Sequence, residues 1–188
     1  GGWPQVYPLR ADYSRHITFN DDAMIGVLAL LEDLAGGRVL PAAGEDRRRR
    51  ANTAIDAATT KILRAQVHVD GRATVWCAQH DALTLEPRPA RSYEHVSLSG
   101  RESVDIVRFL MRRTPRPDIV AAVDAAVAWL EDARLPNGEW PRFYEIGTNR
   151  PIYSGRDGIV RYDLDEVEAE RRTGYTWLGT WPRRLIDS

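Results

Sequence analysis

Four segments of this chain carry apolar residues at helical spacing, and each segment is bounded by residues that stop a helix. The first begins at Ala23 and ends at Gly36–Gly37, with one apolar face made of Met24, Val27, Leu28, Leu31 and Leu34. The second is expected over about residues 46–67. The third follows a capping box, Ser99 to Glu102, and stops at Pro115, while the fourth runs from Asp118 to a point before Pro136. A short last helix is expected at residues 165–172.

Little of the remaining sequence is typical of strands. Residues 73–78 predict a short buried strand or an extended passage, and residues 142–146 and 159–162 a small hairpin around the turn at 153–158. With 188 residues, of which 43% are hydrophobic, the chain has enough apolar material for one core. We therefore expect an all-α, mainly helical single domain over residues 1–188 with long irregular loops.

Charge and cysteine content exclude several classes of function. The formal net charge is −1, which does not favour general binding to nucleic acid or to an anionic membrane. No apolar run approaches the roughly 20 residues that span a bilayer. Cys77 is the only cysteine, so neither an intramolecular disulfide nor a cysteine-based zinc site is expected. The chain begins at Gly1 without a signal peptide, which suggests a processed product or a fragment.

The last quarter of the chain mixes arginines with aromatic residues. It contains Arg142, Arg150, Arg156, Arg161, Arg171 and Arg172 among Trp140, Phe143, Tyr144, Tyr153, Tyr162, Tyr175 and Trp177. Guanidinium groups bind carboxylates in a two-pronged geometry, and aromatic faces stack on sugar rings or bases, so this composition suits an acidic, ring-shaped ligand. The alternative is a solvated surface on which the arginines pair with neighbouring acids.

Two further features offer groups for a site. Asn20, Asp21, Asp22 and Asp81 supply hard oxygen ligands of the kind that calcium prefers, but their spacing is not that of an EF-hand, and a helix N-cap with one surface acid is the simpler explanation of these residues alone. Gly155 and Gly158 flank Arg156 and allow a tight turn that places its guanidinium in a cleft, or at an exposed hairpin tip paired with Asp157.

Read in order, several segments resemble the family 10 polysaccharide lyases, which are bacterial pectate lyases. The resemblance rests on residues 1–5 (GGWPQ), 17–24 (ITFNDDAM), 74–81 (TVWCAQHD), 90–94 (ARSYE), 97–103 (SLSGRES), 142–151 (RFYEIGTNRP), 154–158 (SGRDG) and 170–175 (ERRTGY). It implies a toroid-like (α/α) architecture and calcium-assisted cleavage of polygalacturonate by anti β-elimination. No water is consumed, and the product carries an unsaturated sugar end.

The resemblance also implies roles for individual residues. Arg156 is the candidate base, and an arginine base implies an alkaline optimum because a free guanidine has a pKa above about 12. Arg142, Arg150 and Arg171 are candidate clamps for substrate carboxylates, and Tyr153 is a candidate sugar contact. Asn20, Asp21 and Asp81 are the candidate calcium ligands, with Asp22 in reserve.

The chain departs from the family pattern in length. Family members usually extend before residue 1 and between residues 134 and 140, so part of the toroid is expected to be missing, either in a naturally minimal lyase or in a fragment. The alternative function is therefore a pectin-binding module that has lost turnover. We expect a secreted or periplasmic monomer that prefers unesterified pectate, because methyl esters remove the charge that arginines and calcium hold.

Overall fold

The helices occupy the segments in which the sequence shows helical spacing. The computed structural model describes residues 1–187 and contains α1 (Ala23–Ala35), α2 (Glu45–Ala65), α3 (Glu102–Met111), α4 (Pro117–Asp132), α5 (Ala169–Gly174) and α6 (Arg183–Ile186). Three 3-10 turns, η1 (Tyr13–Arg15), η2 (Asn20–Asp22) and η3 (Leu164–Glu166), precede or link them. The four expected main helices are confirmed to within a few residues, whereas the last short helix begins four residues later than predicted.

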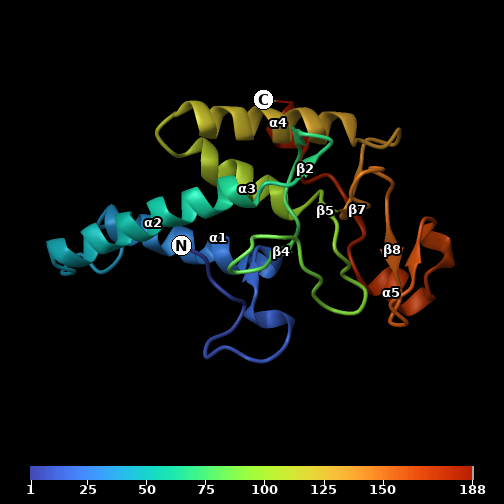
Figure 1. Cartoon of the computed structure of the whole chain (residues 1–188), viewed down its shortest axis with the longest axis horizontal. Helices are drawn as coiled ribbons and strands as arrows, with labels where there is room; N and C mark the ends of the chain where they lie inside the picture. Colours follow the sequence, from blue (N-terminus) through green and yellow to red (C-terminus); the bar gives the residue numbers. More distant parts are fainter. Residues whose placement is uncertain (188) are drawn as a thin grey trace.

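The four long helices bury their apolar faces against one another. α1 lies alongside α2, α3 packs on α4, and contacts between α1 and α3 and between α2 and α4 join the two pairs. Leu28, Ile62 and Leu110 are fully buried in the shared core. In Figure 1, α4 runs along one side of this layer, while the hairpin strand β8 and helix α5 lie at the end away from the first turns of α2. None of the helices in residues 1–187 is long and apolar enough to cross a bilayer.

The start of α3 departs from the predicted capping box: Arg101 is the N-cap, Glu102 is the first helical residue, and the Glu102 carboxylate bonds the Ser99 hydroxyl rather than the Ser99 backbone N–H. The hydroxyl oxygen of Ser99 accepts a hydrogen bond from the backbone N–H of Glu102 at 3.0 Å and donates one to the Glu102 carboxylate. The start of α1 differs from the expected cap. Asp22 makes no side-chain capping hydrogen bond, and Asp21 and Asp22 both adopt left-handed backbone conformations, with φ of 53° and 56°.

Ten short strands form five two-stranded antiparallel sheets. The pairs are β1 (Ile17–Thr18) with β4 (Gln79–His80), β2 (His68–Val69) with β3 (Arg72–Ala73), β5 (Leu98–Ser99) with β7 (Phe143–Tyr144), β6 (Trp140–Pro141) with β10 (Leu178–Gly179), and β8 (Tyr153–Ser154) with β9 (Val160–Arg161). Most of these sheets join segments that are far apart in the sequence. These sheets hold the loops against the helical layer.

The expectation of an all-α, toroid-like (α/α) domain is wrong. Helices share residues 1–187 with five small sheets, and the long helices pack as two joined pairs. A strand of two residues leaves no alternating pattern in the sequence, which is why pattern analysis missed this content. The predicted hairpin is confirmed only for β8 and β9, because residues 143–144 pair with β5 instead.

A second core lies beneath the loops at the far end of the molecule. It is built largely from aromatic side chains, with Phe143, Tyr153 and Trp177 at its centre and Tyr93, Ile152 and Val167 around them. Trp177 packs edge-on against both Phe143 and Tyr153, at ring-centroid distances of 6.2 and 5.8 Å. Much of the arginine-rich tail therefore contributes its aromatic residues to packing, which fixes the positions of the arginines between them.

Candidate functional site

The site begins with a buried ion pair between α3 and β7. Arg142 Nη2 lies 2.6 Å from Glu102 Oε1, and the side chains are 9% and 0% exposed. The same nitrogen donates to Asn20 Oδ1 at 2.9 Å. Burial is the largest single influence and lowers the pKa of Arg142, but the combined interactions with Glu102, Tyr175 and Glu94 raise it overall. Arg142 therefore stays charged and joins three segments of the chain.

Glu94 is a second buried acid and lies next to this pair. Its Oε1 accepts hydrogen bonds from Asn20 Nδ2 at 3.2 Å and from the Tyr175 hydroxyl at 2.8 Å. Burial raises the pKa of the Tyr175 phenol, so this group remains a hydrogen-bond donor. The Tyr175 ring lies under the guanidinium of Arg142, whose carbon is 4.9 Å from the ring centroid. We call this connected set, which consists of Asn20, Glu94, Glu102, Arg142 and Tyr175, the polar floor.

Arg171 lies between two tyrosine rings above this floor. Its guanidinium carbon is 4.8 Å from the Tyr93 ring centroid and 5.8 Å from that of Tyr175. The side chain is 11% exposed, and Nη2 lies 3.1 Å from Glu170 Oε1. Only one edge of this guanidinium therefore reaches the surface.

A turn places Arg156 at the outer end of the same network. Gly158 has a φ of 72°, which favours glycine, and a Cβ at Gly155 would collide with the Glu168 carboxylate at 1.9 Å. That carboxylate accepts the backbone N–H of Arg156 at 2.7 Å. The Arg156 side chain is 65% exposed and binds Glu170 through Nε at 2.9 Å and Nη2 at 3.0 Å. The expected tight turn is thus present, and its arginine is presented to solvent.

The opposite end of the network is the pair of Asp21 and Arg91. Arg91 Nη2 lies 2.8 Å from Asp21 Oδ2, and Arg91 Nη1 donates to the Tyr93 hydroxyl at 3.1 Å. The Tyr93 hydrogen bond raises the pKa of Arg91. A continuous set of contacts then connects Asp21 to Arg156. We call this set the arginine–carboxylate surface; it consists of Asp21, Arg91, Tyr93, Arg171, Glu170 and Arg156.

Five residues predicted for the site lie outside this surface. Asn20 and Arg142 belong to the polar floor, and the other three make their contacts elsewhere. Asp81 accepts hydrogen bonds from the backbone N–H groups of Leu83 and Thr84 and pairs with Arg88 at 3.4 Å. Arg150 stacks on Tyr162, with its guanidinium carbon 3.7 Å from the ring centroid. Tyr153 is 7% exposed in the aromatic core, which leaves little of its side chain for a sugar.

The proposed calcium ligands do not form a ready-made site. Asn20 Oδ1 accepts hydrogen bonds from Arg142 and from the N–H of Asp21, and Asp21 Oδ2 accepts from Gln5 Nε2 at 3.0 Å and from Arg91. Asp81 is occupied separately in its own loop. Within residues 1–187, no three His, Cys, Asp or Glu side chains gather in a way that could hold a metal ion. The donor oxygens therefore do not fit a bound calcium as they stand.

Pattern analysis did not assign roles to several members of the site. Arg91 and Glu94 lie in one of the segments that carry the family resemblance, but their distance in sequence from the arginine-rich tail gave no reason to group them with it. Glu102 was explained by the capping box, and it uses its second oxygen to hold Arg142.

Comparison with known proteins places this geometry in context. The sequence model of a family described as Pectic acid lyase matches residues 1–139 and 134–186. No curated protein matches the chain. Two solved structures are similar: a mutant of the family 10 polysaccharide lyase from Cellvibrio cellulosa in complex with trigalacturonic acid, and the family 10 polysaccharide lyase from Cellvibrio cellulosa. Each is 39% identical, with a TM-score of 0.92 over 98% of this chain. This chain spans 65% and 64% of their lengths.

Proposed function

The chain belongs to the family 10 polysaccharide lyases, and from this premise we propose that it cleaves polygalacturonate, an α-1,4-linked polymer of galacturonate, by β-elimination. The similar Cellvibrio structure with trigalacturonic acid supports galacturonate units as the ligand. The products would be oligogalacturonates with a 4,5-unsaturated end.

The observation that carries this proposal is the arginine–carboxylate surface. Arg91 and Arg156 are 34% and 65% exposed, and their partners Asp21 and Glu170 are exposed carboxylates. A galacturonate carboxylate has the same chemistry as these partners, so it can replace either one without leaving a cation unpaired. The surface is therefore suited to exchange its own acids for those of a substrate.

In the proposed reaction, Arg156 removes the proton at C5 of a galacturonate unit. The electron pair of the C5–H bond forms the C4–C5 double bond, and the bond from C4 to the glycosidic oxygen breaks. The departing oxygen gains a proton from solvent and becomes a hydroxyl group, and Arg156 then releases the C5 proton to solvent, so no water is consumed. Arg91 and the exposed edge of Arg171 would pair with the uronate carboxylate, which acidifies the C5 proton and stabilises the negative charge that develops there.

The sequence suggests that Arg142 binds a substrate carboxylate, but we propose a different role for it. Its side chain is buried and engaged with Glu102 and Asn20. We assign it the positioning of the polar floor rather than direct contact with sugar. Arg150 and Tyr153 stay predictions, and both lie apart from the surface that carries the reaction.

Calcium stays a prediction. Bound calcium supplies positive charge to uronate carboxylates in such chemistry. Because Asn20, Asp21 and Asp81 do not converge in this structure, no step of the proposed reaction depends on calcium.

One observation favours a second candidate function, a pectate-binding module without turnover. The hydrogen bonds from Arg156 to Glu170 raise the Arg156 pKa, which keeps the guanidinium charged and opposes its use as a base. A charged Arg156 still binds uronate. Binding of uronate therefore requires a charged Arg156, whereas its use as a base requires the neutral form.

The deciding experiment measures ultraviolet absorbance of the unsaturated product from polygalacturonate. The full chain is assayed at neutral and alkaline pH, with calcium and with a chelator. Growth of absorbance supports the lyase. Retention of pectate without product at any pH supports the binding module, and absence of both contradicts either function.

A further inference from the structure

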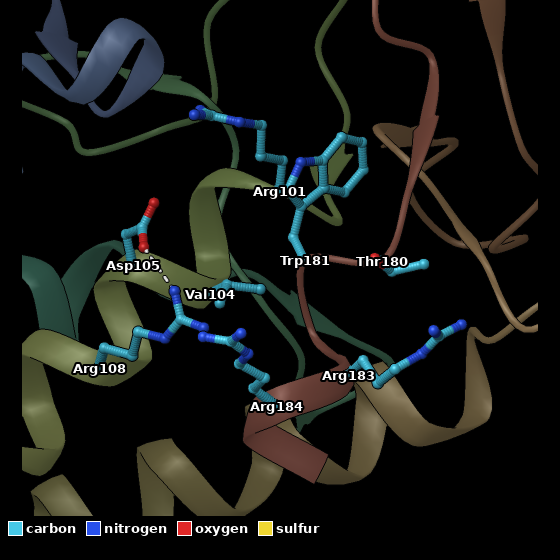
Figure 2. A pocket seen from close by; sticks show the side chains of 8 residues that line it. All are labelled: Arg101, Val104, Asp105, Arg108, Thr180, Trp181, Arg183 and Arg184. Atoms are coloured by element: carbon cyan, nitrogen blue, oxygen red, sulfur yellow. Dashed lines mark hydrogen bonds and ion pairs between the residues drawn. The ribbon is translucent and has the colours of Figure 1, made fainter. Parts of the chain in front are cut away.

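A basic pocket lies on the side of α3 that faces the C-terminal segment. Its volume is about 560 Å³, and its lining includes four arginines, Arg101, Arg108, Arg183 and Arg184, together with Asp105 and Trp181. Figure 2 shows the side chains of Arg108 and Arg184 extending into the same part of the pocket from α3 and α6. Asp105 is the one acid among the described residues of this lining, so the charge balance of each arginine depends on its individual contacts.

The internal contacts of the described residues leave Arg184 without an acidic partner. Asp105 pairs with Arg108 at 3.2 Å, and Arg183 donates to the Gly138 carbonyl at 3.2 Å, with its side chain directed away from the others (Figure 2). Arg184 is exposed, and its guanidinium has no hydrogen bond or ion pair with any residue in the described range 1–187. An unpaired guanidinium beside a second arginine favours an anion.

Trp181 adds an aromatic surface to these charges. The side chain is partly buried between β10 and α6, and a Cβ at Gly179 would lie 2.6 Å from its ring, so the glycine lets the ring lie flat against the backbone. No residue within 1–187 accepts a hydrogen bond from the indole N–H. A fixed aromatic face with a free donor is suited to a sugar ring that carries hydroxyl groups.

Arg101 connects this pocket to the polar floor of the site. Its Nη1 lies 3.3 Å from Glu102 Oε1, the same oxygen that binds Arg142, and 3.9 Å from Asp22. Arg101 thus belongs to the pocket lining and also contacts the polar floor, which places the pocket beside the site.

We propose that this pocket binds a further uronate unit of the polysaccharide, with its carboxylate on Arg184 and Arg108 and its ring on Trp181. This inference rests on the proposed function, because it takes galacturonan as the polymer. Arg101 lies between the two binding surfaces. The pocket would increase affinity for long chains over short ones.

The test is equilibrium binding of a long oligogalacturonate to the full chain, by calorimetry, in an Arg156→Ala background that prevents turnover. Arg184→Gln should weaken binding by about 3- to 10-fold, as expected for loss of one charge-assisted contact. Trp181→Phe keeps an aromatic ring but removes the indole donor, and it should weaken binding less. Arg64→Gln, on the exposed side of α2 away from the pocket, is the matched control and should bind normally.

The outcomes separate this inference from the proposed function. If Arg184→Gln binds the long oligogalacturonate with unchanged affinity, the proposed uronate site in the pocket is wrong, even if the unmodified chain forms unsaturated product. Absence of product from the unmodified chain contradicts the lyase, whereas weaker binding in Arg184→Gln still supports the pocket. If inorganic phosphate binds in an Arg184-dependent way but oligogalacturonate does not, the pocket is an anion site of another kind and the uronate assignment is wrong.

Discussion

Glu170 accepts two hydrogen bonds from the guanidinium of Arg156, at 2.9 Å from Nε and 3.0 Å from Nη2. The pair closes the outer end of the arginine–carboxylate surface, and both side chains are more than half exposed. Its effect on the proposed base is unfavourable, because the carboxylate stabilises the charged guanidinium and raises its pKa. Turnover therefore requires that this pair open or that the pH be high.

Replacement of Glu170 by Gln should move the pH profile of product formation towards lower pH. Loss of the carboxylate removes the main cause that raises the Arg156 pKa, so the neutral guanidine forms at a lower pH. The measurement is the rate of absorbance increase across an alkaline pH series. Glu166→Gln, an exposed acid in η3 on the same segment, is the control and should leave the profile unchanged. A shift towards higher pH would contradict Arg156 as the base.

Replacement of Arg156 by Ala should abolish product formation while the fold remains intact. A positioned general base contributes about 100- to 10,000-fold to a rate, and the exposed Arg156 side chain supports no core packing. Product formation and circular dichroism are compared with those of Arg172→Ala, an arginine of α5 that pairs with Asp165. Loss of activity in both variants would point to a general charge effect. Near-normal activity in Arg156→Ala would remove this residue from the reaction.

Calcium dependence can be assigned to individual acids by substitution. If Asp21 contributes to calcium binding, Asp21→Asn should raise the calcium concentration needed for half-maximal product formation about tenfold or more. Asp81→Asn tests the second acidic ligand proposed from the sequence, which lies with Arg88 in a separate loop. Asp33→Asn, on α1 and paired with Arg38, is the control. Full activity of the unmodified chain in excess chelator would rule out a calcium requirement.

His80 should make the protein less stable in acid. Its Nε2 accepts the backbone N–H of Cys77 at 3.1 Å, and Nδ1 lies 2.9 Å from the Leu85 carbonyl, so the neutral ring satisfies both partners. Burial lowers the His80 pKa to about 4. The unfolded chain, with a histidine pKa of about 6.5, therefore binds more protons between these values, and stability is lost as pH falls through this window.

The expected loss is about 3 kcal/mol of unfolding free energy between about pH 6.5 and pH 4. Urea denaturation at a series of pH values measures it. His80→Gln should show a smaller acid-dependent loss, whereas His68→Gln, an exposed histidine in β2, should retain it. Equal pH dependence in all three proteins would show that another group is responsible.

The sequence predicted the helices because their physical causes are local. Apolar residues recur at helical spacing in α1 and α4, and the Ser99 hydroxyl accepts the backbone N–H of Glu102, three residues further on, where α3 begins. The five sheets have no such local signal. β5 and β7, for example, are two residues long and separated by more than forty positions, so only the folded chain brings them together.

The candidate site was predictable in part for the same reason. Residue types pointed to acidic-ligand chemistry, and Asp21, Arg156 and Arg171 do lie in one connected surface. Burial was not predictable from residue type: Arg142 and Tyr153 look like ligand contacts in the sequence, yet packing encloses both. Tertiary structure determines which arginines are exposed to solvent. Exposure in turn determines whether an arginine can bind a substrate carboxylate or only holds neighbouring residues in position.

Arg142 and Glu102 should be far more important for stability than any exposed ion pair. Replacement of Arg142 by Met leaves the Glu102 carboxylate buried without its cation, which costs about 3–5 kcal/mol of unfolding free energy in comparable cases. The double variant Arg142→Met/Glu102→Gln should recover part of this loss, because no buried charge remains. Arg116→Met, which breaks an exposed pair with Asp118, is the control and should change stability little. Urea denaturation compares the four proteins, and equal stability of Arg142→Met and Arg116→Met would mean that water reaches Glu102 and that the polar floor is not a closed support.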